Sequence, residues 1–363
     1  MKNQLHILSQ PDNHVINDII NNFVKKEGLF VLKVQPFMAS ILKRKYVRDL
    51  RIDTPSETSK YLIFPRAILF SLTSSLTILL NRKKLEKYKN YKFSHAHFVM
   101  PDGIISKYLK KKYHVPYVVT MRATDTKRRK FLVRYVQNSV FKYADKIHIT
   151  APWIKNYIPK KFWNKVVIIP HGIYPTDFSN KCIKNKNSIN VVTVSSFIKR
   201  KHVDWIIDCF KNIRSFNCRL TIIGNGPEEA KLKQLGKNNK NIVFLGHMSH
   251  DDVIEQLSKT DIFVLPSYDE TFGLVYLEAM ANKNAVIAYR YSGIGGLFKH
   301  GKEAVYVKNK KSLDRYLNKL IIDKDFRQPI SLNSYKKVKE GFLWNNIFKK
   351  YENLYESLVN NYD

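Results

Sequence analysis

The stretch from Asp261 to Ala281, DIFVLPSYDETFGLVYLEAMA, most strongly constrains the fold of this chain. Its short apolar run, bounded by a turn signal at Pro266-Ser267, predicts a buried strand over Asp261–Leu265. The apolar residues Leu274, Leu277 and Ala281 then follow at helical spacing. A buried strand that passes through a turn into a helix is typical of α/β folds built on a parallel sheet.

Two glutamates bracket this junction, Glu270 before the predicted helix and Glu278 inside it. Eight helical residues span about two turns and about 12 Å, so the two carboxylates are suited to opposite ends of one ligand. Phe272 and Gly273 lie between them at the predicted helix start. Their backbone N–H groups would favour an anion there, because the first N–H groups of a helix lack intrahelical partners.

Glu270, seven residues and Glu278, with Phe272-Gly273-Leu274 between them, resemble the E-x7-E signature of family-4 retaining glycosyltransferases, glycosyltransferase group 1. The resemblance implies an α/β fold of the GT-B type. In this fold two Rossmann-like domains face each other across a cleft that holds a nucleotide-sugar, and a C-terminal helix crosses back to the N-terminal domain. The structural alternative is an acid-capped amphipathic helix with one solvated glutamate.

The charge balance predicts anionic partners. The 363 residues contain 63 Lys and Arg against 30 Asp and Glu, a formal net charge of +33. Such a field attracts nucleic acid, an anionic membrane or phosphorylated substrates, unless it is only a compositional bias that coats the surface. The length predicts two or three domains, and the 44% hydrophobic content predicts folded ones.

The cysteines and the N-terminus indicate a reducing, cytoplasmic location. Cys182, Cys209 and Cys218 form no Cys-x-x-Cys pair and no metal spacing. The first residues lack the apolar core and cleavage site of a signal peptide. The apolar window Tyr61–Leu80 is interrupted at Pro65-Arg66, which argues against a spanning helix. It predicts a core helix or, with basic residues on both sides, a face lying peripherally on the plasma membrane.

The N-terminal half shows strand and helix alternation. We expect strands at Leu5–Leu8, Phe30–Val34, Tyr117–Thr120 and Ala144–Thr150, and helices at Val15–Lys26 and Gly103–Tyr113. His95 and His97 are expected on one strand with only one of them in the sheet packing, and no metal site is predicted.

Arg122 lies after a predicted strand in Arg122-Ala123-Thr124-Asp125. This turn resembles the family's His-Gly-x-Asp-like turn, with arginine in place of histidine. The resemblance implies that Arg122 faces the diphosphate or the acceptor. The alternative is a surface cation in a run that continues with Lys127, Arg128, Arg129 and Lys130.

The passage His171-Gly172-Ile173 with Asp177-Phe178 resembles the family's passage between its two domains. The polar stretch Ser179–Asn190 is then the linker. We expect an acceptor-binding domain over residues 1–178, a nucleotide-sugar-binding domain over 190–340 and a terminal helix over 341–363 that packs on the first domain.

A cationic loop, Lys199-Arg200-Lys201, follows the predicted strand Asn190–Val194 and precedes the helix Val203–Ile213. A loop at the carboxyl end of such a strand is where open α/β sheets bind phosphates. The resemblance makes Lys201 the family's diphosphate-binding lysine. Ser196 replaces the family's arginine, so Arg200 or Arg122 would supply that charge; the alternative is a solvated charge run.

Two further turns are candidates for the nucleotide. Gly224 opens a Gly-Asn-Gly turn whose glycines permit close backbone approach to a ligand, which alone is weak evidence. Gly246-His247-Met248 corresponds to the family's turn near the nucleobase. The helix Asp251–Leu257 and the strands Arg219–Ile223, Asn241–Leu245 and Asn284–Tyr289, with helices at Leu313–Ile322 and Ile347–Leu358, complete the predicted C-terminal half.

The resemblance implies a retaining transferase of the hexosyltransferase type. Lys201, Arg200 and Arg122 would stabilise the leaving diphosphate, Glu270 would bind the donor sugar and Glu278 the ribose. A UDP-sugar is the expected donor, with no cofactor and no metal. The expected acceptor is a glycan or lipid-linked intermediate of cell-surface polysaccharide, lipooligosaccharide or teichoic acid synthesis.

Two other functions fit parts of the sequence. A nucleotide-sugar epimerase or a phosphorylase would use the same fold. A nucleic-acid-binding protein would use the charge, but it requires basic residues interleaved with exposed aromatics. The aromatic residues here fall mostly within apolar strand and helix patterns, so no nucleic-acid partner is expected.

Overall fold

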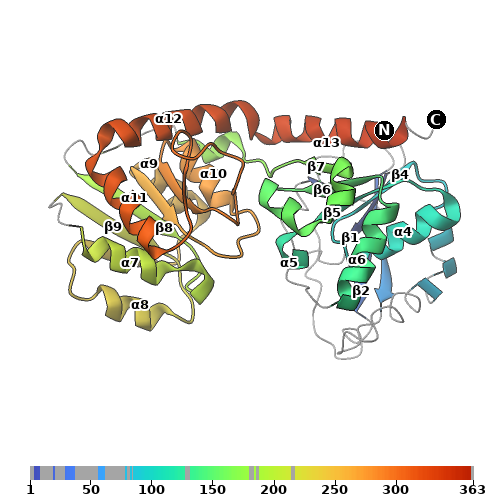
Figure 1. Cartoon of the computed structure of the whole chain (residues 1–363), viewed down its shortest axis with the longest axis horizontal. Coiled ribbons are helices and arrows are strands. Elements are labelled where there is room, and N and C mark those ends of the chain that lie inside the picture. The colour runs from blue at the N-terminus through green and yellow to red at the C-terminus, as the bar shows by residue number, and fades with distance from the viewer. Residues whose placement is uncertain are drawn as a thin grey trace. The chain divides into compact units, whose positions relative to one another are not determined.

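The computed structural model describes residues 4–8, 19–20, 29–36, 56–61, 78–79, 82–83, 85–126, 131–179, 184, 188–213 and 217–360. The chain forms two compact units (Figure 1). The N-terminal unit comprises Met1–Thr150, Ile154–Ile169 and Phe348–Asp363. The C-terminal unit comprises Ala151–Trp153 and Pro170–Ile347.

The N-terminal unit is built on a seven-stranded parallel sheet with the order β3-β2-β1-β4-β5-β6-β7. Its strands are β1 (Gln4–Leu8), β2 (Leu29–Pro36), β3 (Ser56–Tyr61), β4 (Phe93–Ala96), β5 (Tyr117–Met121), β6 (Lys146–Ile149) and β7 (Val166–Ile168). Its helices include α4 (Asp102–Tyr113), α5 (Ala123–Thr126), α6 (Phe131–Tyr143) and the 3-10 segments η2 (Pro152–Tyr157) and η3 (Lys160–Lys165). The strand order reverses between β1 and β4, which is where doubly wound sheets bind ligands.

The C-terminal unit contains a six-stranded parallel sheet with the order β10-β9-β8-β11-β12-β13. Its strands are β8 (Ile189–Val194), β9 (Cys218–Ile223), β10 (Ile242–Gly246), β11 (Ile262–Leu265), β12 (Ala285–Tyr289) and β13 (Val305–Val307). Its helices are α7 (Val203–Lys211), α8 (Glu229–Gly236), α9 (His250–Ser258), α10 (Leu274–Ala281), α11 (Lys310–Ile322) and α12 (Lys324–Gly341), with 3-10 segments η4 (Pro175–Asp177) and η5 (Lys199–Lys201).

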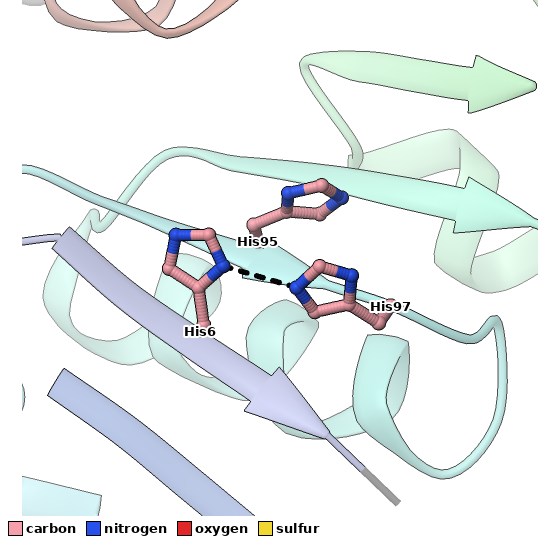
Figure 2. Close-up of side chains that lie close together, drawn as sticks. All are labelled: His6, His95 and His97. Carbon is pink, nitrogen blue, oxygen red and sulfur yellow. Dashed lines mark hydrogen bonds between the residues drawn. The ribbon is translucent and has the colours of Figure 1, made fainter. Parts of the chain in front are cut away.

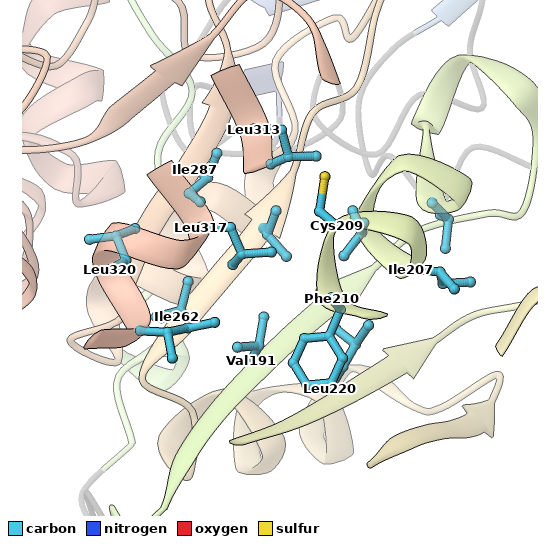
Figure 3. Packing of buried hydrophobic residues seen from close by; sticks show 14 of the residues in the cluster. Val191, Ile207, Cys209, Phe210, Leu220, Ile262, Ile287, Leu313, Leu317 and Leu320 are labelled. Atoms are coloured by element: carbon cyan, nitrogen blue, oxygen red, sulfur yellow. The ribbon is translucent and has the colours of Figure 1, made fainter. Parts of the chain in front are cut away.

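Alternate strand residues of the C-terminal unit supply two cores, one on each face of its sheet. Val191 and Ile262 pack with α7, α8 and α11, and Figure 3 shows this cluster around Phe210 and Leu317. The neighbouring strand residue Phe263 packs with α9, α10 and α12 on the opposite face. Strands buried on both faces must be apolar throughout, which explains the continuous apolar runs in the sequence.

The last helix, α13 (Trp344–Val359), contributes Phe348 and the residues after it to the N-terminal unit. Tyr351 and Tyr355 of this helix are fully buried there. Burial of two large aromatic side chains accounts for the association of this segment with a sheet more than two hundred residues earlier in the chain.

The structure confirms the two parallel α/β sheets and most of the predicted strands, with ends shifted by at most two residues. The elements that were not predicted include β3, β13, α5, α6 and α12. β3 has the sequence SETSKY, whose lack of apolar residues gives no strand signal. The helix predicted at Val15–Lys26 lies outside the described residues except for two helical residues, Ile19 and Ile20.

Most of the apolar window Tyr61–Leu80 also lies outside the described residues, as do Lys127–Lys130 and most of the predicted linker. Tyr61 is the last residue of β3. In the part of the chain that the structure describes, no helix combines the length and apolar composition needed to cross a membrane.

Candidate functional site

An ion pair between Lys201 and Glu270 lies at the carboxyl ends of two neighbouring strands. Lys201 ends η5 in the loop after β8, and Glu270 lies in the loop between β11 and α10. The Lys201 ammonium contacts Glu270 Oε2, and the two side chains are only 11% and 13% exposed. Because β8 and β11 are adjacent and parallel, both loops emerge at the same edge of the sheet.

Hydrogen bonds hold both loops in place. The Ser267 hydroxyl donates to Glu270 Oε2 over 3.2 Å, and the Gly293 N–H donates to the Glu270 carbonyl over 2.9 Å. The Tyr268 N–H donates to the Arg200 carbonyl, while Arg200 Nη1 donates to the Asp269 carbonyl over 3.1 Å. The cationic loop is therefore tied to the Glu270 loop, so the alternative that this stretch is only a solvated charge run is wrong for Lys201.

The segment Phe272-Gly273-Leu274 contributes backbone groups. The Phe272 side chain is buried in the core and contacts His171, and Leu274 is half-buried. Gly273 has a φ of +75° at the start of α10, and a Cβ there would lie 2.7 Å from the Tyr276 ring. Only glycine fits this approach without strain. The first N–H groups of α10 are thus the part of this segment able to bind an anion.

Glu278, on α10, lies in an acidic cluster with one histidine. His250 Nε2 is 3.6 Å from Glu278 Oε1 and 3.6 Å from Asp177 Oδ1. Glu278 is 8% exposed, whereas the His250 side chain is 57% exposed. Burial raises the pKa of the Glu278 carboxyl to about 7; His250 opposes this rise and Asp177 adds to it. Burial also raises the pKa of Asp177.

The two glycine turns lie beside the cationic loop of the same unit. Gly224 has a φ of +131°, and a Cβ there would lie 1.9 Å from the Ser195 carbonyl oxygen. Its N–H donates to the Gly246 carbonyl over 2.7 Å. The close approach that Gly224 permits is therefore to the neighbouring loop. After Gly246, His247 is exposed and Met248 is half-buried against the core.

Arg122 belongs to the N-terminal unit and is 3% exposed. Its Nε donates to the His97 carbonyl over 3.0 Å, and its guanidinium lies over the Phe98 ring at 5.2 Å. Burial lowers the pKa of the guanidinium, with partial compensation from Tyr351, Asp125 and Asp102. The alternative of an exposed surface cation is thus wrong. The described structure places Arg122 at the end of β5, in a polar layer that contains several histidines.

Figure 2 shows three buried histidines of this layer: His6 on β1, His95 on the neighbouring strand β4, and His97 directly after β4. The expectation that only one of His95 and His97 packs against the sheet is wrong. Residues two apart on a strand point to the same face, and the two rings stack with centroids 4.1 Å apart. Burial lowers the pKa of His6 to about 3. Burial also lowers the pKa of His95 and of His97 well below the usual range of histidine, so all three rings are neutral.

The three histidines have nitrogens close enough together to share a metal ion. Hydrogen bonds occupy both nitrogens of His95 and one nitrogen of each other ring. His95 Nδ1 lies 2.7 Å from the Tyr355 hydroxyl and His95 Nε2 lies 2.7 Å from Thr120 Oγ1. His6 Nδ1 and His97 Nε2 are hydrogen-bonded to each other at 3.0 Å, whereas His6 Nε2 and His97 Nδ1 are buried with no hydrogen-bond partner among the described residues. A metal shared by all three rings would have to displace a hydrogen bond of His95 in a fully buried layer, so we retain the expectation of no metal as a prediction.

Sequence reasoning missed His250 and Ser267 as parts of the site. Ser267 belongs to the turn signal itself, two residues after β11, and His250 is the first residue of α9. Neither residue carries a pattern of its own. Their place in the chain could have identified them. Ser267 follows the end of β11, and His250 begins the helix after β10, so both lie at the carboxyl edge of the parallel sheet, where such folds bind ligands.

Comparison with known sequences agrees with this geometry. A family model described as "Glycosyl transferases group 1" matches residues 176–337. An uncharacterized glycosyltransferase of Methanocaldococcus jannaschii is 30% identical over 278 residues, covering 73% of this chain and 75% of that protein. An alpha-monoglucosyldiacylglycerol synthase of Acholeplasma laidlawii is 25% identical over 355 residues, covering 86% of this chain and 87% of that protein.

Solved structures show the same architecture. The apo form of the lipopolysaccharide outer core galactosyltransferase WaaB has a TM-score of 0.78 at 16% identity, covering 98% of this chain and 99% of that one. HepE from Anabaena in complex with UDP has a TM-score of 0.74 at 15% identity, covering 98% of this chain and all of that one. These similarities show the GT-B fold.

The raised pKa of Glu278 makes a testable prediction about stability. The folded-state pKa of about 7 lies above the ordinary value of 4.5. The folded protein therefore binds more protons than the unfolded chain between these values, and stability falls as the pH rises through this window. Glu278→Gln removes the ionisable group. The unfolding free energy of the variant minus that of the parent should therefore be larger at pH 8 than at pH 5, by at most about 3 kcal/mol.

Urea unfolding at the two pH values measures this difference. Glu340→Gln, on an exposed residue of the same unit, is the matched control and should show no such pH dependence. An equal effect of Glu278→Gln at pH 5 and pH 8 would show that the carboxyl is ionised throughout.

Proposed function

Since the chain belongs to the group 1 glycosyltransferases, we propose that it transfers a hexose from a UDP-sugar to a glycan or lipid-linked acceptor with retention of the anomeric configuration. The observation that carries the proposal is the buried pair of Lys201 and Glu270 at the carboxyl edge of the C-terminal sheet. A cation that stabilises a diphosphate and a carboxylate that binds sugar hydroxyls are the two groups that this transfer requires within reach of one bond.

Lys201 is the group that stabilises the leaving diphosphate in this proposal. In the structure its ammonium is paired with Glu270. A diphosphate that enters the site offers the ammonium a more highly charged partner. As the bond between sugar and phosphate oxygen breaks, negative charge grows on the diphosphate, and a fixed cation with little solvent around it stabilises that charge strongly. Arg200 and the first N–H groups of α10 add to this field, and Arg122 is proposed to contribute its charge as well.

When Lys201 pairs with the diphosphate instead of with Glu270, the Glu270 carboxylate becomes able to bind the donor sugar. Ser267 and the Thr271 N–H hold its two oxygens in position, at 3.2 Å each. A carboxylate accepts hydrogen bonds from two sugar hydroxyls in a forked geometry. Glu278 would bind the ribose hydroxyls in the same manner, with His250 beside it to compensate the charge. The Gly246-His247-Met248 turn would border the nucleobase.

UDP is the proposed nucleotide because a protein of the same fold, HepE, is known in complex with UDP. Neither a cofactor nor a metal ion is required, because Lys201 and the backbone N–H groups supply the positive charge that the diphosphate needs. The nucleotide-sugar is a substrate of the reaction.

The acceptor proposal rests on charge and on the relatives. One relative is named a synthase of a glucosylated diacylglycerol and one structural neighbour a lipopolysaccharide galactosyltransferase. A net charge of +33 suits a cytoplasmic enzyme that binds peripherally to an anionic membrane, where such acceptors are assembled for surface polysaccharide, lipooligosaccharide or teichoic acid. No nucleic-acid partner is part of the proposal.

Replacement of Lys201 should weaken nucleotide binding. Lys201→Ala removes the cation proposed to contact the diphosphate, and we expect UDP affinity to fall by about tenfold or more. Lys199→Ala is the matched control, because Lys199 is an exposed member of the same cationic segment. Titration calorimetry with UDP measures both variants. Equal affinity of Lys201→Ala and the parent would remove Lys201 from the donor site.

Replacement of Glu270 should reduce transfer more than nucleotide binding. Glu270→Gln keeps the shape but loses the charge that binds the sugar, so we expect kcat/KM to fall by about tenfold to a hundredfold, with UDP affinity nearly unchanged. A glycosyl-transfer assay with UDP-sugars measures this, and NMR of the product reports its anomeric configuration. An inverted product would contradict the retaining mechanism.

Membrane association is tested with vesicles. If the charge serves docking, the protein should co-sediment with vesicles that contain anionic lipid, should not bind neutral ones, and should be released by high salt because screening weakens exposed charge interactions. Equal binding to anionic and neutral vesicles would show that the net charge of +33 does not serve membrane docking.

A further inference from the structure

A cavity of the C-terminal unit lies away from the Lys201–Glu270 pair. Its volume is about 230 Å³, and its walls come from α12 and from the residues next to β11 and α10. Asp261 lies immediately before β11, whereas Glu270 follows that strand. The cavity is therefore at the amino edge of the sheet, opposite the edge that carries the proposed donor site.

The charges that line this cavity are predominantly positive. Four cationic residues line it together with one carboxylate, that of Asp261: Lys184, Lys283, Lys324 and Arg327. Asp261 Oδ2 already accepts a hydrogen bond from the Asn190 N–H over 2.9 Å. Four cationic residues against one carboxylate give the cavity a positive local potential, which favours the binding of an anion.

Arg327 and Lys324 come from one face of α12, and Arg327 is anchored. Its Nη1 donates to the carbonyls of Leu320 and Ile321 at the end of α11, over 2.5 and 3.0 Å. A guanidinium carries five N–H donors, so this anchoring fixes the group in the cavity wall and leaves other donors for a ligand. A rigid guanidinium binds phosphate well, through paired hydrogen bonds.

Lys283 lines the cavity in an unfavourable backbone conformation. It follows α10 with a φ of +57°, a position at which glycine is the preferred residue. Its ammonium lies 5.0 Å from the Tyr335 ring centroid, and its carbonyl accepts a hydrogen bond from Lys184 over 2.6 Å. A cationic residue thus lines the cavity at a backbone cost that glycine would avoid. Such outliers gather at ligand sites.

From this geometry we infer that the cavity is a binding site for a small phosphate-bearing anion, such as inorganic phosphate or the phosphate ester of a single sugar. The cavity volume of about 230 Å³ has room for a ligand of this size. The phosphate contacts Arg327, Lys324 and Lys283, and the remaining oxygen of Asp261 accepts from a ligand hydroxyl. This site is independent of the proposed transfer reaction.

Titration calorimetry of the full chain at low salt tests the inference, with inorganic phosphate, glucose 6-phosphate and glucose as probes. We expect both phosphates to bind and glucose to give no signal. Lys324→Gln/Arg327→Gln should weaken phosphate binding by about tenfold or more. Lys283→Gly should weaken it as well, while the melting temperature stays unchanged or rises, because glycine suits the backbone there.

Two controls separate this cavity from other cations. Lys237→Gln/Lys240→Gln removes two exposed charges elsewhere on the same unit and should leave phosphate affinity unchanged. Lys201→Ala, in the proposed donor site, should leave it unchanged too. Absence of phosphate binding by the parent at 10 mM, a level on the order of the weakest specific affinities, would overturn the inference. So would loss of binding in Lys201→Ala with retention in Lys283→Gly, or equal binding of glucose.

Discussion

The parallel pairing of β8 with β11 is the constraint on which the rest of the site depends. Val191 and Val192 pair with Ile262 and Phe263, so the loops after the two strands emerge together. This register brings Lys201 within contact of Glu270, 69 residues later in the chain. A shift of one residue would turn the apolar strand residues to the opposite face of the sheet. Burial of the two apolar cores therefore fixes the strand register, and this register places Lys201 beside Glu270.

Burial gives the pair of Lys201 and Glu270 its chemical use and its cost. Removing two charges from water is expensive, and mutual attraction repays that cost only with further hydrogen bonds. Ser267 and the Thr271 N–H supply such bonds to Glu270. A pair that is poor as a source of stability is useful in a site where an anionic ligand can exchange with one partner. Stability comes instead from the apolar residues on both faces of the sheet.

The N-terminal unit differs in that it buries a polar layer on one face of its sheet. One face of its sheet packs apolar residues such as Leu5, Ile7 and Leu109, whereas the layer around His95 is polar and buried. Several of its groups satisfy one another: His95 bonds with Thr120 and Tyr355, and Thr120 in turn with His148 at 2.8 Å. His6 Nε2 and His97 Nδ1, in contrast, have no hydrogen-bond partner among the described residues. Buried polar groups are tolerated when they are hydrogen-bonded in this way. Arg122 lies within this layer, where its hydrogen bond to the His97 carbonyl holds the guanidinium in one position.

The sequence by itself predicted the local elements and named the residues of the proposed site. The apolar runs predicted strands, and the segment from Asp261 to Ala281 predicted a strand–turn–helix unit with two carboxylates, because side-chain periodicity and turn chemistry are local properties. It also assigned Lys201 to that site through the resemblance. The polar strand β3 escaped prediction because neighbouring strands, and not its own residues, make it a strand.

Only the tertiary structure decided which distant residues meet. The pairing of Lys201 with Glu270, the approach of His250 to Glu278 and Asp177, the burial of Arg122 and the cationic cavity beside Lys283 all depend on strand order and helix packing. Contacts between residues far apart in the chain are set by the burial of whole apolar faces. No spacing along the sequence encodes them one by one.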